Sequence, residues 1–146
     1  METINNNTIN NNTIYTKSNV EFHEYNMYNY IQQLNIVLVP KIINYDRQTK
    51  IMQMEKISGM SVSDFYGEEI EKVPNNIINR IRNIIHTLKL NNIIYPDITG
   101  YNFIKSNGEL LIIDFEHVYF GFNSAQSDPF VEEFLNGTES WNPDFA

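Results

Sequence analysis

Two short apolar segments joined by a polar turn constrain the fold of this chain more than any other feature. Residues 103–105 read Phe-Ile-Lys, and residues 109–114 read Glu-Leu-Leu-Ile-Ile-Asp. The turn between them, Ser106-Asn107-Gly108, contains the Asn-Gly dipeptide that is typical of tight connections between antiparallel strands. The sequence therefore predicts a β-hairpin over this part of the chain.

The hairpin would bring two oxygen-bearing side chains together. Asn102 and Asp114 lie one near the outer end of each strand, and Asp97, five residues before Asn102, would overhang them from a loop. Carboxylate and carboxamide oxygens suit Mg²⁺, a hard cation that retains several waters. A further carboxylate nearby could accept a proton from an attacking hydroxyl. This layout suits phosphoryl transfer, and the alternative is a polar hairpin with exposed Asp and Asn side chains at its rims.

The segment from Tyr95 to Asn102, followed by Asp114-Phe115-Glu116, resembles the catalytic core of the protein-kinase-like superfamily. In that superfamily the catalytic loop runs His/Tyr-x-Asp-x-x-x-x-Asn and the metal motif is Asp-Phe-Gly. The resemblance implies that Asp97 is the catalytic base and that Asn102 and Asp114 hold Mg²⁺.

The chain departs from the superfamily pattern in several places. Pro96 replaces the Arg that normally reads a phosphorylated activation loop, and Glu116 replaces the Gly of the metal motif. Residues 1–16 repeat Thr-Ile-Asn-Asn-Asn without glycine, so the Gly-rich loop over the nucleotide phosphates is absent. Residues 1–12 favour disorder because of their low complexity, with a short Thr-Ile meander as the alternative.

Length and composition bound the fold class. With 146 residues and 42% hydrophobic content, the chain is large enough for a folded core but short for a complete kinase. We expect an α+β domain with a minimal protein-kinase-like fold over residues 1–146. Residues 13–57 would form a small N-terminal β-lobe with one helix, and residues 58–146 a truncated, mostly helical C-lobe that carries the catalytic hairpin.

Charge and cysteine usage bound the partners. A net charge of -8 argues against nucleic acid as a main partner, because no excess cation is available for phosphate backbones. The chain has no cysteine, no signal-like start and no apolar run of membrane-spanning length, which predicts a cytoplasmic protein without a membrane partner. A homodimer or a partner protein is conceivable, because so small an N-lobe leaves apolar surface uncovered.

A helix is expected from Asn19 to about Leu34. Ser18 and Glu21 fit a capping box, and apolar residues recur with helical spacing at Val20, Met27, Ile31 and Leu34.

Glu24 lies in the middle of that apolar stripe, where a carboxylate needs a cationic partner. Lys17 is the nearest candidate, and the pair resembles the Lys–Glu pair of kinases, in which the Lys holds the α- and β-phosphates of the nucleotide. Alternatively, Glu24 lies at the edge of the stripe in solvent. Glu21 is the second candidate partner for Lys17.

Residues 40–45 and 50–55 read as two strands joined by a turn, and residues 56–59 resemble the interlobe hinge of kinases. The resemblance implies that backbone groups of Glu55 and Ile57 bind the adenine edge and that Met54 walls the back of the pocket. An ordinary strand end followed by a Gly turn is the alternative.

Three further helices are expected. Residues 61–66 could form a short one, and Pro74 opens a longer one with a broad isoleucine-rich face. Asp128 begins a third that ends near Gly137, either as a plain N-cap or as the Asp that binds the catalytic loop in kinases. The histidines His23, His86 and His117 have no partners at metal-binding spacing.

The leading functional hypothesis is a kinase-like phosphotransferase that uses ATP and Mg²⁺ as cofactors and moves the γ-phosphate to a hydroxyl acceptor, either a small molecule or a protein. The alternative is a pseudokinase, a kinase-derived module that binds nucleotide or protein without turnover. An unrelated small α+β domain is the third possibility.

Overall fold

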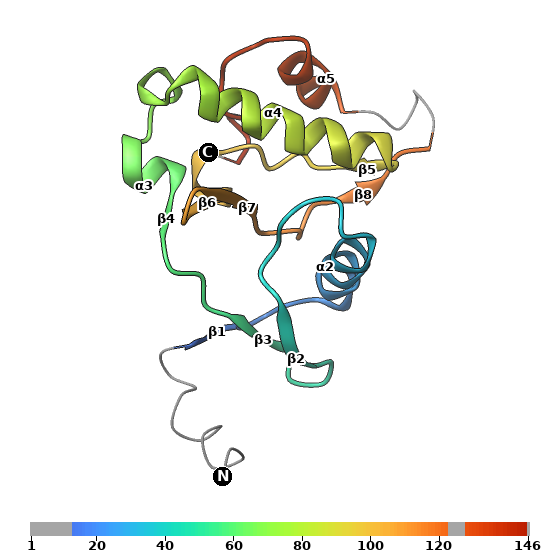
Figure 1. Cartoon of the computed structure of the whole chain (residues 1–146). Helices are drawn as coiled ribbons and strands as arrows, with labels where there is room; N and C mark the ends of the chain where they lie inside the picture. The colour runs from blue at the N-terminus through green and yellow to red at the C-terminus, as the bar shows by residue number, and fades with distance from the viewer. Residues whose placement is uncertain (1–12, 123–127, 146) are drawn as a thin grey trace.

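The computed structural model describes residues 13–122 and 128–145, and its elements form two groups (Figure 1). The expectations for residues 1–12 lie outside the described residues. The first group contains β1 (Ile14–Lys17), α2 (Phe22–Leu34), β2 (Ile42–Asp46) and β3 (Ile51–Glu55). The second group contains β4 (Met60–Ser61), α3 (Val62–Tyr66), η1 (Ile70–Lys72), α4 (Asn75–Leu90), β5 (Ile93–Ile94), η2 (Gly100–Asn102), β6 (Phe103–Ser106), β7 (Glu109–Ile112), β8 (Tyr119–Phe120) and α5 (Pro129–Leu135). This arrangement agrees with the expected α+β class.

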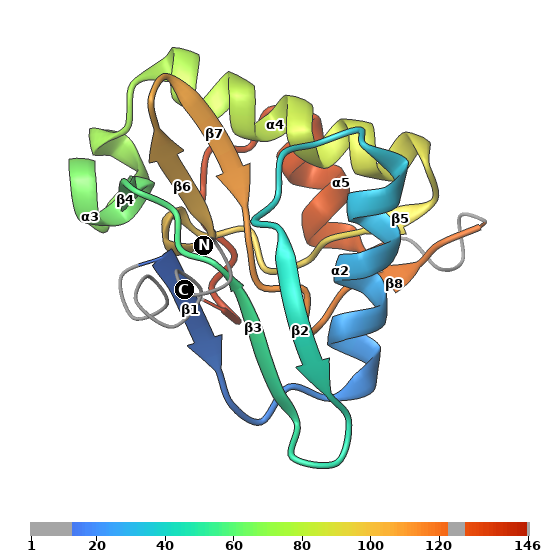
Figure 2. The ribbon, with the colours of Figure 1, turned by 60° about the horizontal axis from the view of Figure 1, so that its bottom comes forward.

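The first group is built on a three-stranded antiparallel sheet with the order β1-β3-β2 (Figure 2). Tyr15 pairs with Met54 and Lys17 pairs with Met52, so these four side chains share one face of the sheet. Met52 and Met54 are buried on that face, and Tyr15, Lys17 and Met54 line a cavity together with Ile104, Ile113 and Asp114 of the second group. The sheet therefore presents Lys17 toward the second group.

The helix α2 begins three residues later than the sequence predicted. Glu21 occupies the N-cap position without a side-chain cap bond, so the expected capping box does not form. Asn19 has a left-handed backbone (φ 60°), and the N–H of Val20 donates to the carbonyl of Lys50 at 2.8 Å. The left-handed backbone of Asn19 is incompatible with a right-handed helical turn at that residue, and the bond from Val20 ties the chain before α2 to the turn between β2 and β3.

The predicted hairpin is confirmed as β6 and β7, which pair from Phe103–Ile112 to Ser106–Glu109. Asn107 and Gly108 both have positive φ (51° and 82°), as a tight turn of this kind requires. The strand β4 extends the sheet beside β6.

The long helix α4 covers the hairpin, and α5 packs against α4 (Figure 1). Pro74 stands at the N-cap of α4, one residue outside the helix it was predicted to open. The isoleucine-rich face is confirmed as the buried one, with Ile77, Ile78, Ile81, Ile85 and Leu88 in the core. Among the described residues no helix is both long and apolar enough to cross a membrane.

Candidate functional site

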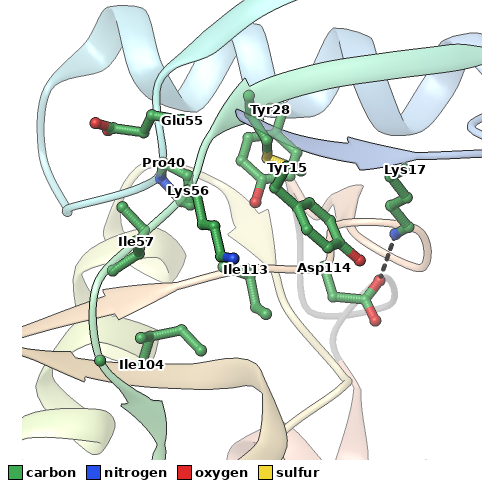
Figure 3. A pocket seen from close by; sticks show the side chains of 12 residues that line it. Tyr15, Lys17, Tyr28, Pro40, Glu55, Lys56, Ile57, Ile104, Ile113 and Asp114 are labelled. Carbon is green, nitrogen blue, oxygen red and sulfur yellow. Dashed lines mark ion pairs between the residues drawn. The ribbon is translucent and has the colours of Figure 1, made fainter. Parts of the chain in front are cut away.

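A cavity of about 360 Å³ lies between the two groups of elements (Figure 3). Its volume falls in the range of small-molecule sites. Its lining residues come from β1, α2, β3, the segments before β2 and after β3, and the hairpin with the two residues that follow it. They are Tyr15, Lys17, Tyr28, Pro40, Met54, Glu55, Lys56, Ile57, Gly59, Ile104, Ile113 and Asp114. Most of the lining is apolar, and Lys17 and Asp114 face each other at one side (Figure 3).

Lys17 and Glu24 form the ion pair that the sequence predicted, with 2.5 Å between Nζ and Oε2. Glu24 is only 3% exposed, so its carboxylate depends on this partner. Burial lowers the pKa of Lys17, but the bond to Glu24 and the nearby charges of Asp114 and Glu116 outweigh that effect and raise it. Lys17 is therefore a charged group at the cavity wall. The second candidate partner, Glu21, pairs with Lys50 instead.

Asp114 lies two residues after the end of β7 and turns its side chain toward Lys17, with 3.6 Å between Nζ and Oδ1. Its backbone is left-handed (φ 69°), a conformation that costs a non-glycine residue about 1–2 kcal/mol. The next residue, Phe115, is fully buried and packs edge-on against Tyr28 and Tyr95. This anchor keeps Asp114 in its unusual conformation at the cavity.

The loop that carries Asp97 and Asn102 is tied to the end of the hairpin. The side-chain amide of Asn102 donates to the carbonyl of Asp97 at 2.9 Å, and Ile113 N–H donates to the carbonyl of Asn102 at 3.0 Å. The hydroxyl of Tyr95 donates to the carbonyl of Ile113 at 2.5 Å. These bonds bring Asp97, Asn102 and Asp114 to the same end of the hairpin, as the sequence predicted.

The carboxylate of Asp97 is bonded to a residue that the sequence analysis set aside. His117 Nδ1 lies 2.7 Å from Asp97 Oδ2, and the other oxygen, Oδ1, is buried without a hydrogen-bond partner among the described residues. Burial raises the pKa of Asp97, and the bond to His117 opposes that shift. The only sequence signal for this pair was the position of His117, three residues after Asp114.

The residues of the predicted hinge, Glu55 and Ile57, line the cavity. Glu55 has fewer backbone groups available to a ligand than expected. Its N–H donates to the carbonyl of Lys41 at 2.8 Å, and its side chain accepts from Lys41 N–H. The carbonyl of Glu55 therefore remains as the group that could meet a ligand, and its side chain points away from Lys17 and Asp114 (Figure 3). The N–H of Ile57 has no acceptor within the described residues. Met54 is buried at the cavity wall, as predicted.

The RIO domain family profile matches residues 2–126 of the chain. The chain belongs to the RIO domain family. It is 33% identical over 118 residues to the EKC/KEOPS complex subunit BUD32 of Enterocytozoon bieneusi, a match that covers 73% of this chain. The chain spans 57% of the length of that relative.

A solved structure, the Cydia pomonella granulovirus kinase PK-1, has a similar fold with a TM-score of 0.53. The match covers 73% of this chain and 42% of the kinase at 16% sequence identity. The family and this structural neighbour together confirm the protein-kinase-like fold that the sequence predicted.

The segment 141–145, which follows the part of the chain that the family profile matches, holds the loop around Asp97, a role that sequence reasoning missed. The buried Asn142 donates from its side chain to the carbonyl of Pro96 at 2.8 Å and from its backbone to the carbonyl of Ile98 at 2.9 Å. The ring of Trp141 lies 3.0 Å from where a β-carbon on Gly100 would be. The segment thus touches the loop on both sides of Asp97.

Asp128, the residue that was expected either to cap a helix or to bind the catalytic loop, is a helix cap. Its Oδ1 accepts from the N–H groups of Phe130 and Val131 at 2.9 and 3.1 Å, at the start of α5. Among the described residues that follow Asp114, Asn142 is the one that bonds to the backbone on both sides of Asp97.

Proposed function

We propose that this chain is an atypical kinase-like phosphotransferase that moves the γ-phosphate of ATP to a hydroxyl acceptor. One observation carries the proposal: Lys17 and Asp114 face each other at the wall of a cavity between two groups of elements. Asn102 and Asp97 are tied to the end of the hairpin from which Asp114 follows. Phosphoryl transfer needs mainly positioning and charge neutralisation, so these few groups are sufficient for it.

The cavity would hold the nucleotide base in its apolar part. Tyr15 and Met54 line it from the sheet, and Ile104 and Ile113 line it from the hairpin, so a flat ring would lie between two apolar walls. The free N–H of Ile57 would donate to the base edge. This placement puts the phosphates at the side where Lys17 and Asp114 face each other.

Lys17 would bind the phosphates and would be held in place by Glu24, the buried partner on α2. Lys56 is a second cation at the cavity, which the sequence analysis did not assign (Figure 3). Asp97 would provide the carboxylate on which removal of the proton from the acceptor hydroxyl depends. The acceptor is a small molecule or a protein, because nothing in the site is shaped for one class alone.

The residues present fit a divalent cation. Asp97 Oδ1 and Asp114 Oδ1 are buried without hydrogen-bond partners among the described residues, and such atoms cost about 1–3 kcal/mol each unless something satisfies them. The amide nitrogen of Asn102 donates to the backbone carbonyl of Asp97, so the side-chain oxygen is the atom of Asn102 that would meet a metal. Asn102 and Asp114 would hold Mg²⁺, which when bound would offset the charge of the phosphates. In the described ranges no group of three or more His, Cys, Asp or Glu side chains is placed to hold a metal, so the proposed site depends on the amide of Asn102 beside the carboxylate of Asp114.

A protein partner is part of the proposal. The name of the curated relative identifies it as a subunit of a complex, and the present chain spans little more than half of that relative. We propose that a partner supplies surface that the small first group of elements lacks.

Calorimetric titration of ATP, with Mg²⁺ and with EDTA, tests the proposal. Wild type should bind ATP more tightly with Mg²⁺, and Asp114→Asn should lose that difference. Glu109→Gln, at the exposed far end of the hairpin, is the matched control and should behave as wild type. Metal-dependent binding without any turnover would favour the pseudokinase alternative. No binding in either condition would contradict the proposal.

A further inference from the structure

Lys56 directs its ammonium group into the cavity, on the side where Ile104 and Ile113 form an apolar wall (Figure 3). Among the described residues, none forms an ion pair or a side-chain hydrogen bond with this ammonium. The neighbouring carboxylate of Glu55 accepts from the backbone N–H of Lys41 instead. A lysine ammonium carries three hydrogen-bond donors, so a ligand that enters the cavity should supply the missing acceptor.

Lys56 belongs to the end of the cavity that would hold the nucleotide base. Lys17 pairs across the sheet with Met52, which lies four residues before Lys56, a separation of roughly 13 Å at the usual rise of a strand. In Figure 3 the ring of Tyr15 lies between Lys56 and the pair formed by Lys17 and Asp114. The two cations therefore face different parts of a bound nucleotide.

The purine bases differ at the edge that Lys56 would meet. Adenine carries an amino group at C6, and this group is a hydrogen-bond donor. Guanine carries a carbonyl oxygen there, next to the N7 acceptor, and lysine side chains bind O6 and N7 of guanine for this reason. An ammonium gains nothing from the amino group of adenine, because both groups are donors. The chemistry of this wall therefore favours a base with a carbonyl group at C6.

We propose that Lys56 sets the base specificity of the cavity and that the protein binds GTP as well as ATP. This inference rests on the proposed function and deepens it, because it names the class of nucleotide that the site takes. The bases with a carbonyl group at C6 are the ones that Lys56 contacts.

The two purines use the predicted hinge in different ways. The O6 atom of guanine has two lone pairs, so it accepts from the N–H of Ile57 and from the ammonium of Lys56, while N1–H of guanine donates to the carbonyl of Glu55. With adenine, the N–H of Ile57 donates to N1 and the amino group donates to the carbonyl of Glu55. Lys56 is an exposed residue, so its side chain turns to solvent when adenine is bound.

Two other roles for Lys56 predict different results. If the ammonium bound the phosphates, its removal would weaken every nucleoside triphosphate equally, because the phosphates are common to all of them. If the ammonium met only solvent, its removal would change no affinity. Base recognition alone makes the effect depend on the group at C6.

The experiment is calorimetric titration of the full chain with ATP, GTP and inosine triphosphate (ITP), each with Mg²⁺. ITP has the carbonyl group of GTP at C6 but lacks the amino group at C2, so it isolates the contact at O6. Wild type should bind GTP and ITP at least as tightly as ATP. Lys56→Met should weaken GTP and ITP by about 10-fold or more and leave the affinity for ATP as in wild type.

Two further variants separate the hydrogen bond from the charge. Lys41→Met removes the same charge from an exposed lysine that does not line the cavity, and it should bind all three nucleotides as wild type does. Lys56→Arg keeps donors at this position and should keep the affinity for GTP and ITP. An equal loss for all three nucleotides in Lys56→Met, or no loss for any, would overturn the proposal.

Nucleosides without phosphates give a second readout for the same contact. Ligand-observed NMR with guanosine and adenosine, in EDTA, should show guanosine binding that weakens in Lys56→Met and adenosine binding that does not change. Equal guanosine affinity in wild type and in Lys56→Met would overturn the role of Lys56 in base recognition.

Failure of the proposed function looks different from failure of this inference. If ATP and GTP bind with the expected preference but no phosphate is transferred, the base specificity holds and the phosphotransferase proposal fails. If ATP binds and is turned over while GTP and ITP do not bind, the proposed function holds and the role of Lys56 is overturned.

Discussion

The buried side-chain amide of Asn142 donates a hydrogen bond to the carbonyl of Pro96, the residue immediately before Asp97. Its backbone N–H donates to the carbonyl of Ile98, the residue immediately after. A residue more than forty positions away in the chain therefore fixes the backbone on both sides of the proposed reaction centre. This bracing leads to the first prediction.

Asn142→Leu should destabilise the protein and slow the reaction. The substitution keeps the approximate size of the side chain but leaves the buried Pro96 carbonyl without its donor, which costs about 1–3 kcal/mol of unfolding free energy. Turnover of ATP should fall more than ATP affinity, because Asn142 touches the loop around Asp97 and does not line the cavity. Urea denaturation measures the stability, calorimetry measures the ATP affinity, and release of phosphate from ATP measures the turnover. Asn76→Leu, on the exposed first turn of α4, is the control, and equal turnover in the two variants would contradict the bracing role.

Removing the cation of the Lys17–Glu24 pair should cost stability and nucleotide affinity together. Lys17→Met leaves the buried Glu24 carboxylate unpaired, a change that typically costs about 3–5 kcal/mol. Lys17→Met/Glu24→Gln should recover most of the stability but none of the ATP affinity, because the phosphate-binding cation is still missing.

The exposed pair between Lys50 and Glu21 is the matched control for this cycle. Lys50→Met should change the unfolding free energy by at most about 1 kcal/mol and leave ATP binding intact. If Lys17→Met/Glu24→Gln bound ATP as wild type does, Lys17 would have no part in the site.

Stability should depend on pH through His117. The bond to Asp97 raises the pKa of His117 in the folded protein, while its pKa in the unfolded protein is about 6.5. A raised pKa means that protonation favours the folded state, so this contribution is fully present below about pH 6.5 and is lost as the pH rises through the folded-state value. The Tm of wild type should therefore exceed the Tm of His117→Asn by more at pH 6 than at pH 9. His86→Asn should show no such trend, and a trend of opposite sign would contradict the ion pair.

Gly59 should not tolerate a side chain, because its backbone lies close to the backbone of Lys105 in the hairpin strand β6. A β-carbon there would lie 2.0 Å from the backbone carbonyl oxygen of Lys105, and the residue has a positive φ. Gly137 also has a positive φ but has no atom near its would-be β-carbon. Gly137→Ala should cost only backbone strain of about 1–2 kcal/mol, and Gly59→Ala should cost more and weaken ATP binding by moving the hinge. Equal unfolding free energies for the two variants would contradict this account.

Local signals in the sequence were sufficient for the hairpin and for α4. The Asn107-Gly108 turn and the isoleucine face from Ile77 to Ile85 act over a few residues, and the structure follows them. The pairing of Lys17 with Glu24 could also be predicted, because a carboxylate in an apolar stripe needs a nearby cation. The start of α2 could not be predicted, because it depends on the left-handed backbone of Asn19 and on the contact of Val20 with Lys50, thirty residues further along the chain.

The contacts around Asp97 were the least predictable part of the site. His117 lies in an irregular segment after Asp114, and its orientation depends on Asp97 and Phe145 from elsewhere in the chain. Asn142 lies in another irregular segment, for which neither periodicity nor a motif gives a position. Both residues act through tertiary contacts that no local pattern encodes.

A crystal structure of the chain with Mg²⁺ and a non-hydrolysable ATP analogue tests the central claim most directly. We predict that the base lies between Met54 and Ile113, that the phosphates contact Lys17, and that Asn102 and Asp114 share one metal ion. A nucleotide bound elsewhere on the molecule, or an empty cavity at saturating nucleotide concentration, would contradict the account.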